Sequence, residues 1–233
     1  MEKKRVFSKS LLLLAITSIM LFAMSITSMA ATETDMNIQQ TGSSSSKVDI
    51  TWKTYLGQNI HYHVDMSYDG INWAMQEYTY NPNETIYGLT EGSSYYVRIS
   101  VYNKDFHSTD SSKDGNLVAV SQKQLVSTNP SKVQNLRQTK ATKNSISMTW
   151  DAVAGASSYK ILIFENYDYK TVATSKTNSV TIKGLDASSN IEYYVAAVKN
   201  VNGYEAVGDR SESVDMKTVP KKVTRVAINR LIR

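Results

Sequence analysis

The feature that most constrains the fold is a pattern that occurs twice in the chain. Trp52 and Trp150 lie 98 positions apart, and each follows an apolar residue by fourteen positions. Further along each copy, Gly88-Leu89 returns as Gly184-Leu185 at an offset of 96. Several matches in the same order indicate an internal duplication, and so two similar domains that each bury a Trp. The other matches are Ile38 with Leu136, Gln40 with Gln138, and Tyr95-Tyr96-Val97 with Tyr193-Tyr194-Val195.

Hydrophobic and polar residues alternate through both copies. The cleanest run places Tyr95, Val97, Ile99 and Val101 at every second position. A period of two is that of a strand with one face on a core and the other face in water. Turn residues separate such runs, and no helical period follows residue 30. The sequence therefore predicts an all-β chain of sandwich architecture.

Both copies resemble the fibronectin type III domain. In that family a Trp on the second strand packs between the two sheets, which matches Trp52 and Trp150. Pro130 resembles the Pro that leads the opening strand of such a domain. The resemblance implies two tandem immunoglobulin-like β-sandwiches, at residues 34–128 and 130–219.

The same family places a Tyr six positions after a Leu, at a corner where the chain crosses between sheets. Leu89 and Tyr95 match this spacing in the first copy. The resemblance implies that the Tyr95 ring is buried and that its hydroxyl bonds the backbone. The second copy departs from the spacing, because Tyr193 follows Leu185 by eight positions. Either Tyr193 or Ile191 occupies the corner there.

The N-terminus has the pattern of a secretory signal. Basic residues precede an apolar stretch over 11–23, and Ser28-Met29-Ala30 supplies small residues before a cleavage point. We predict a signal peptide over residues 1–30, with a retained membrane anchor as the alternative. A signal peptide on a chain without Cys favours a bacterial protein that is secreted or displayed at the cell surface. After cleavage we expect no membrane association and a monomer.

The C-terminal residues 220–233 allow two interpretations. Pro220 to Val226 repeat the form of Pro130 to Leu136, which predicts the first strand of a truncated third domain. The alternative is a basic tail. The signal peptide and residues 217–233 carry the positive charge of the chain, so that residues 31–216 have a net charge of −4. A mildly acidic body offers no basic face to phosphates, and we expect no nucleic-acid partner.

Catalytic and metal-binding residues are few. No G-x-S-x-G, P-loop or H-E-x-x-H motif occurs, and one of the three His, His107, lies in a polar loop. His61, His63 and Asp65 share one strand face and form a weak candidate metal site. Since Ile60, Tyr62 and Val64 alternate with them as core residues, we expect the imidazoles to point to water. The sequence thus predicts no enzyme and no cofactor.

Aromatic residues are abundant in the first copy. Tyr96 and Tyr102 are out of phase with the core and are expected to be exposed. They could form a platform for a cell-surface glycan or an extracellular protein. The alternative is that Tyr is simply a favoured strand residue. The proposed platform consists of Trp73, Tyr78, Tyr80, Tyr87, Tyr96 and Tyr102.

These observations favour a non-catalytic extracellular tandem module, which acts as a spacer or an adhesion and recognition unit of a larger secreted or surface protein. Two alternatives stay open. One is a carbohydrate- or protein-binding module that uses the Tyr-rich face. The other is a pair of accessory domains of a secreted glycan hydrolase.

Overall fold

A computed structural model describes residues 31–104 and 115–222. The predicted signal peptide, His107 and most of the predicted C-terminal strand lie outside these residues. Residues 220–222, which are described, belong to no strand. No helix in the described ranges is long and apolar enough to cross a membrane.

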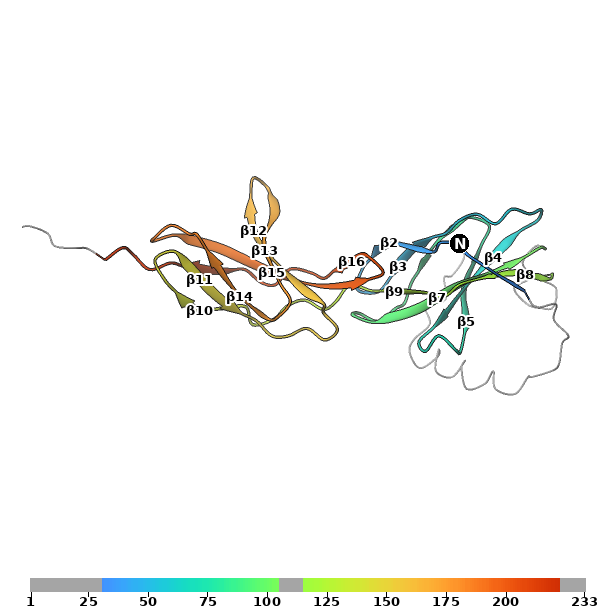
Figure 1. Cartoon of the computed structure of the whole chain (residues 1–233), viewed down its shortest axis with the longest axis horizontal. Coiled ribbons are helices and arrows are strands. Elements are labelled where there is room, and N and C mark those ends of the chain that lie inside the picture. Colours follow the sequence, from blue (N-terminus) through green and yellow to red (C-terminus); the bar gives the residue numbers. More distant parts are fainter. Residues whose placement is uncertain (1–30, 105–114, 223–233) are drawn as a thin grey trace, which may run out of the picture. The chain divides into compact units, whose positions relative to one another are not determined.

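Every regular element that the structure describes is a strand (Figure 1), which confirms the predicted all-β class. Nine strands form the first sandwich: β1 (Thr32–Thr34), β2 (Gln39–Ser43), β3 (Val48–Thr51), β4 (His61–Ser67), β5 (Ala74–Thr79), β6 (Asn83–Ile86), β7 (Ser94–Tyr102), β8 (Leu117–Ser121) and β9 (Gln124–Ser127). Eight form the second: β10 (Arg137–Ala141), β11 (Ser145–Thr149), β12 (Ser158–Glu165), β13 (Asp168–Ser175), β14 (Ser179–Lys183), β15 (Asn190–Val201), β16 (Tyr204–Val207) and β17 (Val214–Lys217).

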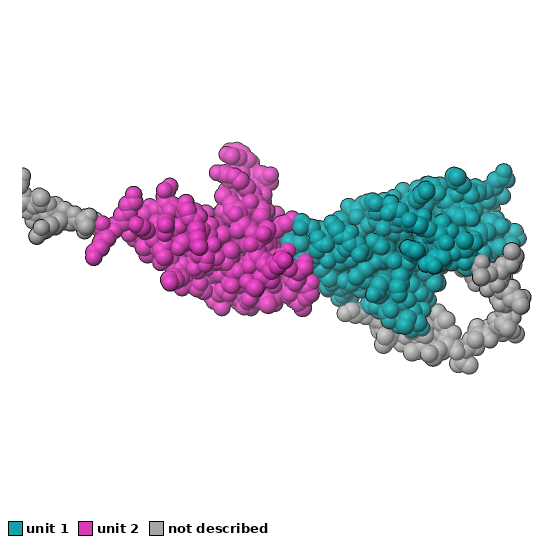
Figure 2. Space-filling view, viewed as in Figure 1, with its two compact units in different colours: residues 1–131, 198–208 teal, residues 132–197, 209–233 magenta. Residues whose placement is uncertain are grey.

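Each sandwich consists of a small and a large sheet. In the first, β2-β3-β6 faces β1-β8-β7-β4-β5, with β9 also pairing with β7. In the second, β10-β11-β14 faces β13-β12-β15-β16, with β17 also pairing with β15. The chain forms two compact units, Met1–Ser131 with Val198–Gly208 and Lys132–Ala197 with Asp209–Arg233 (Figure 2). The end of β15 and all of β16 are therefore counted with the first unit.

The predicted Trp residues lie at the centre of the two cores. Trp52 meets the Tyr62 ring edge-on at 5.4 Å, and Trp150 meets the Tyr159 ring in the same way at 5.2 Å. Both Tyr hydroxyls accept a hydrogen bond from a backbone N–H, at 3.0 Å for Tyr62 and 2.9 Å for Tyr159. These pairs show that the duplication extends to the contacts inside the cores.

A Gln side chain joins the two sheets of each sandwich. Gln40 on β2 donates to the Ser127 carbonyl at 2.7 Å and accepts from the Ser127 N–H at 2.9 Å. Gln138 on β10 makes the same two bonds to Lys217, at 3.1 and 2.8 Å. We refer to each such pair of bonds as a glutamine clamp. Because β2 and β9 belong to different sheets, the clamp closes one edge of the sandwich.

Two equivalent hydrogen bonds identify the corner residue of the second sandwich. The Ile99 N–H donates to Ser121 Oγ at 2.8 Å, and the Val195 N–H donates to Ser211 Oγ at 3.0 Å, so Ile99 corresponds to Val195 at an offset of 96. At this offset Ile191, and not Tyr193, is the counterpart of Tyr95. The match of Tyr95 with Tyr193 at an offset of 98 was therefore wrong in register.

The first sandwich does have the predicted Tyr corner. Tyr95 is fully buried, and its hydroxyl accepts a hydrogen bond from the Thr90 N–H at 2.8 Å. The Tyr68 ring packs on the Tyr95 ring with centroids 5.1 Å apart. Burial, the nearby Tyr95 hydroxyl and a hydrogen bond with it together raise the pKa of Tyr68 to about 12.

Replacing Tyr95 with Phe should destabilise the first sandwich by about 1–3 kcal/mol, since the Thr90 N–H loses its acceptor. Urea unfolding followed by the separate indole NMR signals of Trp52 and Trp150 measures each sandwich in one sample. We expect the Trp52 transition to move to lower urea and the Trp150 transition to stay. Unchanged transitions would contradict a stabilising role for the corner hydroxyl.

The first sandwich should also lose stability in alkali. Tyr68 ionises near 10.0 when unfolded and near 12 when folded. Between these values the unfolded chain ionises first, so the contribution of Tyr68 is complete below pH 10 and is lost as the pH rises toward 12. Urea midpoints for Trp52 at pH 9 and pH 11.5 test this. The Tyr68→Phe variant should show a smaller loss, and an equal loss in both proteins would refute the assignment.

Candidate functional site

The predicted site residues of β4 and β7 lie on one face of the large sheet in the first sandwich, which we call the outer face. The core residues of these strands, such as Val64 and Ile99, point to the opposite face. The two strands are antiparallel, and their register places four outer-face pairs in a row. The pairs are Tyr96 with Ser67, Arg98 with Asp65, Ser100 with His63, and Tyr102 with His61.

The expectation that the two imidazoles point to water was wrong. His61 is fully buried, and His63 and Asp65 are only 6% and 8% exposed. Tyr102 on the neighbouring strand covers both rings, with centroids 5.4 Å from His61 and 4.3 Å from His63. The Tyr80 ring approaches His61 to 6.1 Å. Alternation places side chains on this face correctly, but large rings on adjacent strands exclude water from it.

The two imidazoles form a hydrogen-bonded pair. His61 Nε2 lies 3.1 Å from His63 Nε2, and His61 Nδ1 contacts the Lys104 carbonyl oxygen. Because a carbonyl only accepts, His61 Nδ1 carries the proton, and a neutral His61 then accepts from the His63 Nε2–H. These bonds occupy both nitrogens of His61 and Nε2 of His63, which are then not available to a metal ion.

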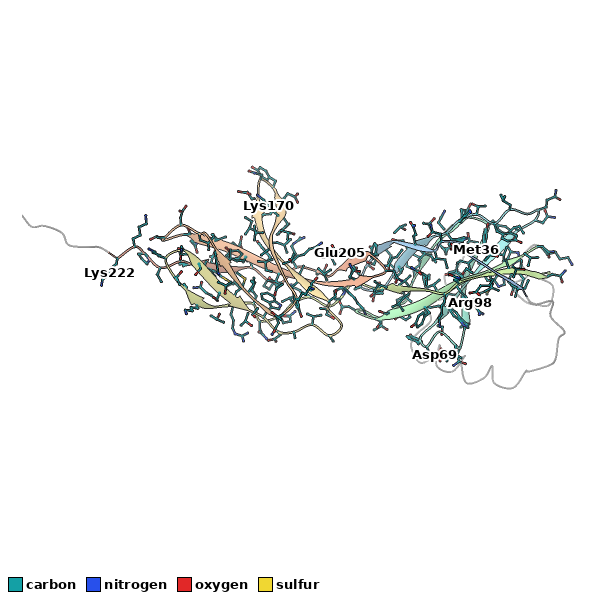
Figure 3. The ribbon with its side chains drawn as sticks, viewed as in Figure 1. Met36, Asp69, Arg98, Lys170, Glu205 and Lys222 are labelled. Atoms are coloured by element: carbon teal, nitrogen blue, oxygen red, sulfur yellow. The ribbon has the colours of Figure 1, made fainter. Side chains whose placement is uncertain are left out.

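Asp65 does not join the histidines in a common site. Its Oδ2 accepts from Arg98 Nε at 3.1 Å and from Ser100 Oγ at 2.6 Å. Arg98, labelled in Figure 3, also places its guanidinium 4.4 Å from the Trp73 ring centre. No group of three or more His, Cys, Asp or Glu that could hold a metal ion occurs in residues 31–104 and 115–222. In this part of the chain the two histidines are not joined by a third metal ligand.

The predicted aromatic platform is brought together in part. Tyr78 and Tyr80 are 41% and 54% exposed, and their ring centroids are 6.4 Å apart. Together with Tyr102 and the histidine pair they form one cluster, which we call the Tyr–His cluster. Tyr102 is half-buried, which corrects the expectation that it is exposed.

The other three members of the platform, Trp73, Tyr87 and Tyr96, lie outside the Tyr–His cluster. Trp73 packs with Arg98. Tyr96 is half-buried, which corrects the expectation that it is exposed, and it lies beside Lys123, whose Nζ is 4.9 Å from the ring centre. Tyr87 directly follows β6, which belongs to the smaller sheet. Sequence reasoning missed Arg98 as a member of the outer face, although the alternation in β7 indicates it.

Comparison with known proteins agrees with this architecture. Residues 131–216 match the family model of the fibronectin type III domain, so the chain contains a domain of this type in its second half. None of the curated proteins matches the chain.

Several solved structures are similar to the chain. The chicken CNTN1 FN1–FN3 domains share 16% identity, with 82% of this chain and 69% of that chain covered and a TM-score of 0.43. A segment of two fibronectin type III domains from chicken tenascin shares 12% identity, with 78% and 98% covered and a TM-score of 0.38. The domain of human fibronectin type III domain containing protein 3 shares 24% identity, with 41% and 92% covered and a TM-score of 0.35.

Removing the Arg98 charge should destabilise the first sandwich, because Asp65 would stay buried without its cation. We expect Arg98→Met to lower the free energy of unfolding by about 1–3 kcal/mol, and the double variant Asp65→Asn/Arg98→Met to recover part of that loss. Lys170→Met is the matched control. It breaks the exposed pair between Lys170 and Glu165, 3.6 Å apart, and should change stability by less than about 0.5 kcal/mol. Equal effects of the two single changes would show that burial of Asp65 does not matter.

Proposed function

We propose that this chain is a non-catalytic extracellular module that acts as a spacer or as an adhesion and recognition unit of a larger secreted or surface protein. The observation that carries the proposal is the fibronectin type III domain over residues 131–216, which is preceded by a sandwich with the same core pairs and glutamine clamp. Domains of this type occur mostly as non-catalytic extracellular modules. The signal peptide predicted over residues 1–30 agrees with export.

Two carboxylates, Asp49 and Asp69, have lowered pKa values for structural reasons. Burial would raise the pKa of Asp49, but hydrogen bonds from Thr85 and Lys47 and the charge of Lys47 bring it below its ordinary value. Asp69 accepts hydrogen bonds from the Asn72 and Ile71 backbone, which lower its pKa well below the usual range. The hydrogen bonds that lower these pKa values also stabilise a strand pair and a turn. Carboxylates with such low pKa values do not provide the proton donor or acceptor near neutral pH that general acid–base catalysis needs.

Recognition by the outer face is a second candidate, favoured by the exposure of Tyr78 and Tyr80. Two neighbouring exposed rings supply rigid contact area at little entropic cost. Tyr80 packs against the rest of the Tyr–His cluster, because His61 contacts both Tyr80 and Tyr102. A glycan or an extracellular protein would contact these two rings first.

The double variant Tyr78→Ala/Tyr80→Ala separates the two roles. If the outer face recognises a ligand, binding of the labelled full chain to a glycan array and to an extracellular protein array should fall about tenfold or more. The control variant Phe164→Ala/Tyr167→Ala removes two exposed rings from the β12–β13 hairpin, which projects from its unit in Figure 1, and should bind as before. These rings are 50% and 97% exposed. Array binding that is absent, or unchanged in Tyr78→Ala/Tyr80→Ala, would exclude recognition by this face and leave the spacer role.

A further inference from the structure

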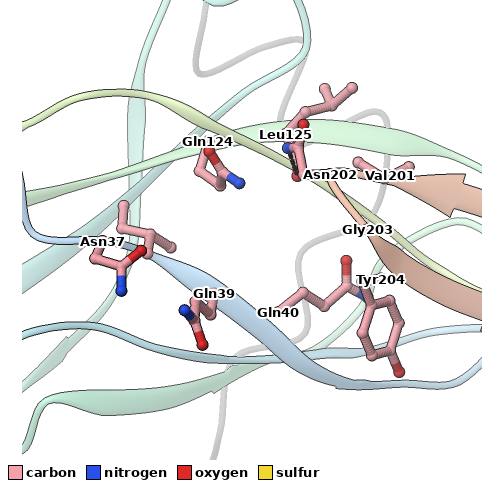
Figure 4. A pocket seen from close by; sticks show the side chains of 10 residues that line it. Asn37, Gln39, Gln40, Gln124, Leu125, Val201, Asn202, Gly203 and Tyr204 are labelled. Carbon is pink, nitrogen blue, oxygen red and sulfur yellow. Dashed lines mark hydrogen bonds between the residues drawn. The ribbon is translucent and has the colours of Figure 1, made fainter.

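A polar pocket of about 310 Å³ lies in the first compact unit, and none of its lining residues belongs to the Tyr–His cluster. Its walls come from the start of β2, the start of β9, and the turn between β15 and β16 (Figure 4). Five amide side chains surround it together with Tyr204: those of Asn37, Gln39, Gln40, Gln124 and Asn202. A volume at the lower end of the range for small-molecule sites suits a small ligand.

The lining of the pocket is electrically neutral. Ten residues line it, and none of them is Asp, Glu, Lys, Arg or His. Each carboxamide offers two N–H donors and a carbonyl acceptor. A hydroxyl group, which both donates and accepts, is the functional group that such a lining complements best, whereas an ionic group would meet no opposite charge.

Several amides of the pocket have unused hydrogen-bonding capacity. Within residues 31–104 and 115–222, the side chains of Asn37, Gln39 and Gln124 make no hydrogen bond to another residue. Asn37 and Gln39 are exposed and Gln124 is half-buried, so a ligand in the pocket can reach all three. Figure 4 shows Gln39 and Gln124 on two sides of the space, with Asn37 between them at one end.

The remaining walls are fixed in position. Gln40, beside Gln39, is engaged in the glutamine clamp with Ser127. Asn202 donates to the Leu125 carbonyl at 2.9 Å, and the Tyr204 hydroxyl lies 3.2 Å from Ser43 Oγ. The backbone of Asn202 has a φ of 52°, the left-handed conformation that a tight hairpin turn requires. A site whose frame is already ordered loses little entropy on binding.

We propose that this pocket binds a neutral saccharide of one or two rings. The amides of Asn37, Gln39 and Gln124 bond the sugar hydroxyls, and the Tyr204 ring supplies an apolar contact for a sugar face. A neutral peptide also carries donors and acceptors, but peptides bind along an extended groove or a free strand edge, and this pocket is short and bounded by three segments. The site is separate from the outer face, so the proposal does not depend on recognition by Tyr78 and Tyr80.

Titration of the ¹⁵N-labelled full chain tests the proposal, with the Asn and Gln side-chain NH₂ signals as the readout. The probes are glucose, galactose, N-acetylglucosamine and cellobiose, with galacturonate and glucosamine as charged counterparts and acetyl-tetraglycine amide as a neutral peptide. We expect at least one neutral sugar to shift the Gln39 and Gln124 signals in a saturable manner. Gln39→Ala/Gln124→Ala should weaken that binding about tenfold or more, since two neutral hydrogen bonds are lost.

Two matched variants make the result specific. Gln134→Ala removes an exposed Gln outside the pocket and should leave the titration unchanged. Tyr78→Ala/Tyr80→Ala should also leave it unchanged, so that failure of outer-face recognition and failure of this proposal are distinguishable. No saturable shift with any neutral sugar, tighter binding of a charged sugar or of the peptide, or binding that survives Gln39→Ala/Gln124→Ala would each overturn the proposal.

Discussion

Each sandwich depends on a Trp that packs between its two sheets against the edge of a Tyr. The pair buries two of the largest side chains of the core in one place, and the Tyr hydroxyl accepts an N–H from the loop that leads into its strand. In the described part of the chain, the buried side-chain nitrogen and oxygen atoms without a hydrogen bond are the two indole nitrogens, Trp52 Nε1 and Trp150 Nε1. An unpaired buried N–H is unfavourable by about 1–3 kcal/mol. That both copies retain one indicates that the packing of the indole ring outweighs the lost bond.

The polar bonds that join the two sheets follow from the same constraint. The chain has no Cys, so no disulfide links the sheets across the Trp. Instead the clamps of Gln40 and Gln138 each provide two hydrogen bonds from a side chain to the backbone of the opposite sheet. A carboxamide has the donor and acceptor spacing of a peptide group, so it continues the strand pairing where the backbones have separated. The strand register is irregular at the residue that follows each Gln, where a bulge interrupts the pairing of β2 with β3 and of β10 with β11.

The inner residues of both sandwiches could be predicted from the sequence, because alternation and the repeated Trp depend on local order alone. The surroundings of the outer residues could not. His61 and His63 lose contact with water through rings on β7 and at the end of β5, and no local pattern indicates how far a neighbouring ring reaches. The corner of the second sandwich was ambiguous because Tyr-Tyr-Val recurs at an offset of 98 in the sequence. The hydrogen bonds of Ile99 and Val195 show that β7 and β15 correspond at an offset of 96, the same offset as between Gly88-Leu89 and Gly184-Leu185. The glutamine clamp did leave a signal, the recurrence of Gln at an offset of 98.

The two copies share their core and differ on the outer faces of their large sheets. Tyr62 and Tyr159 are equivalent, so the outer positions of β4 that hold His61, His63 and Asp65 correspond to Ser158, Lys160 and Leu162 on β12. The buried imidazole pair and the Asp65–Arg98 bond therefore belong to the first sandwich alone, although the fold does not require them. A polar network that is costly to bury and that the second copy lacks is not explained by stability, because the second sandwich forms with an aliphatic residue where the first has Asp65. The outer face of the first sandwich therefore carries a buried polar network that the second sandwich folds without.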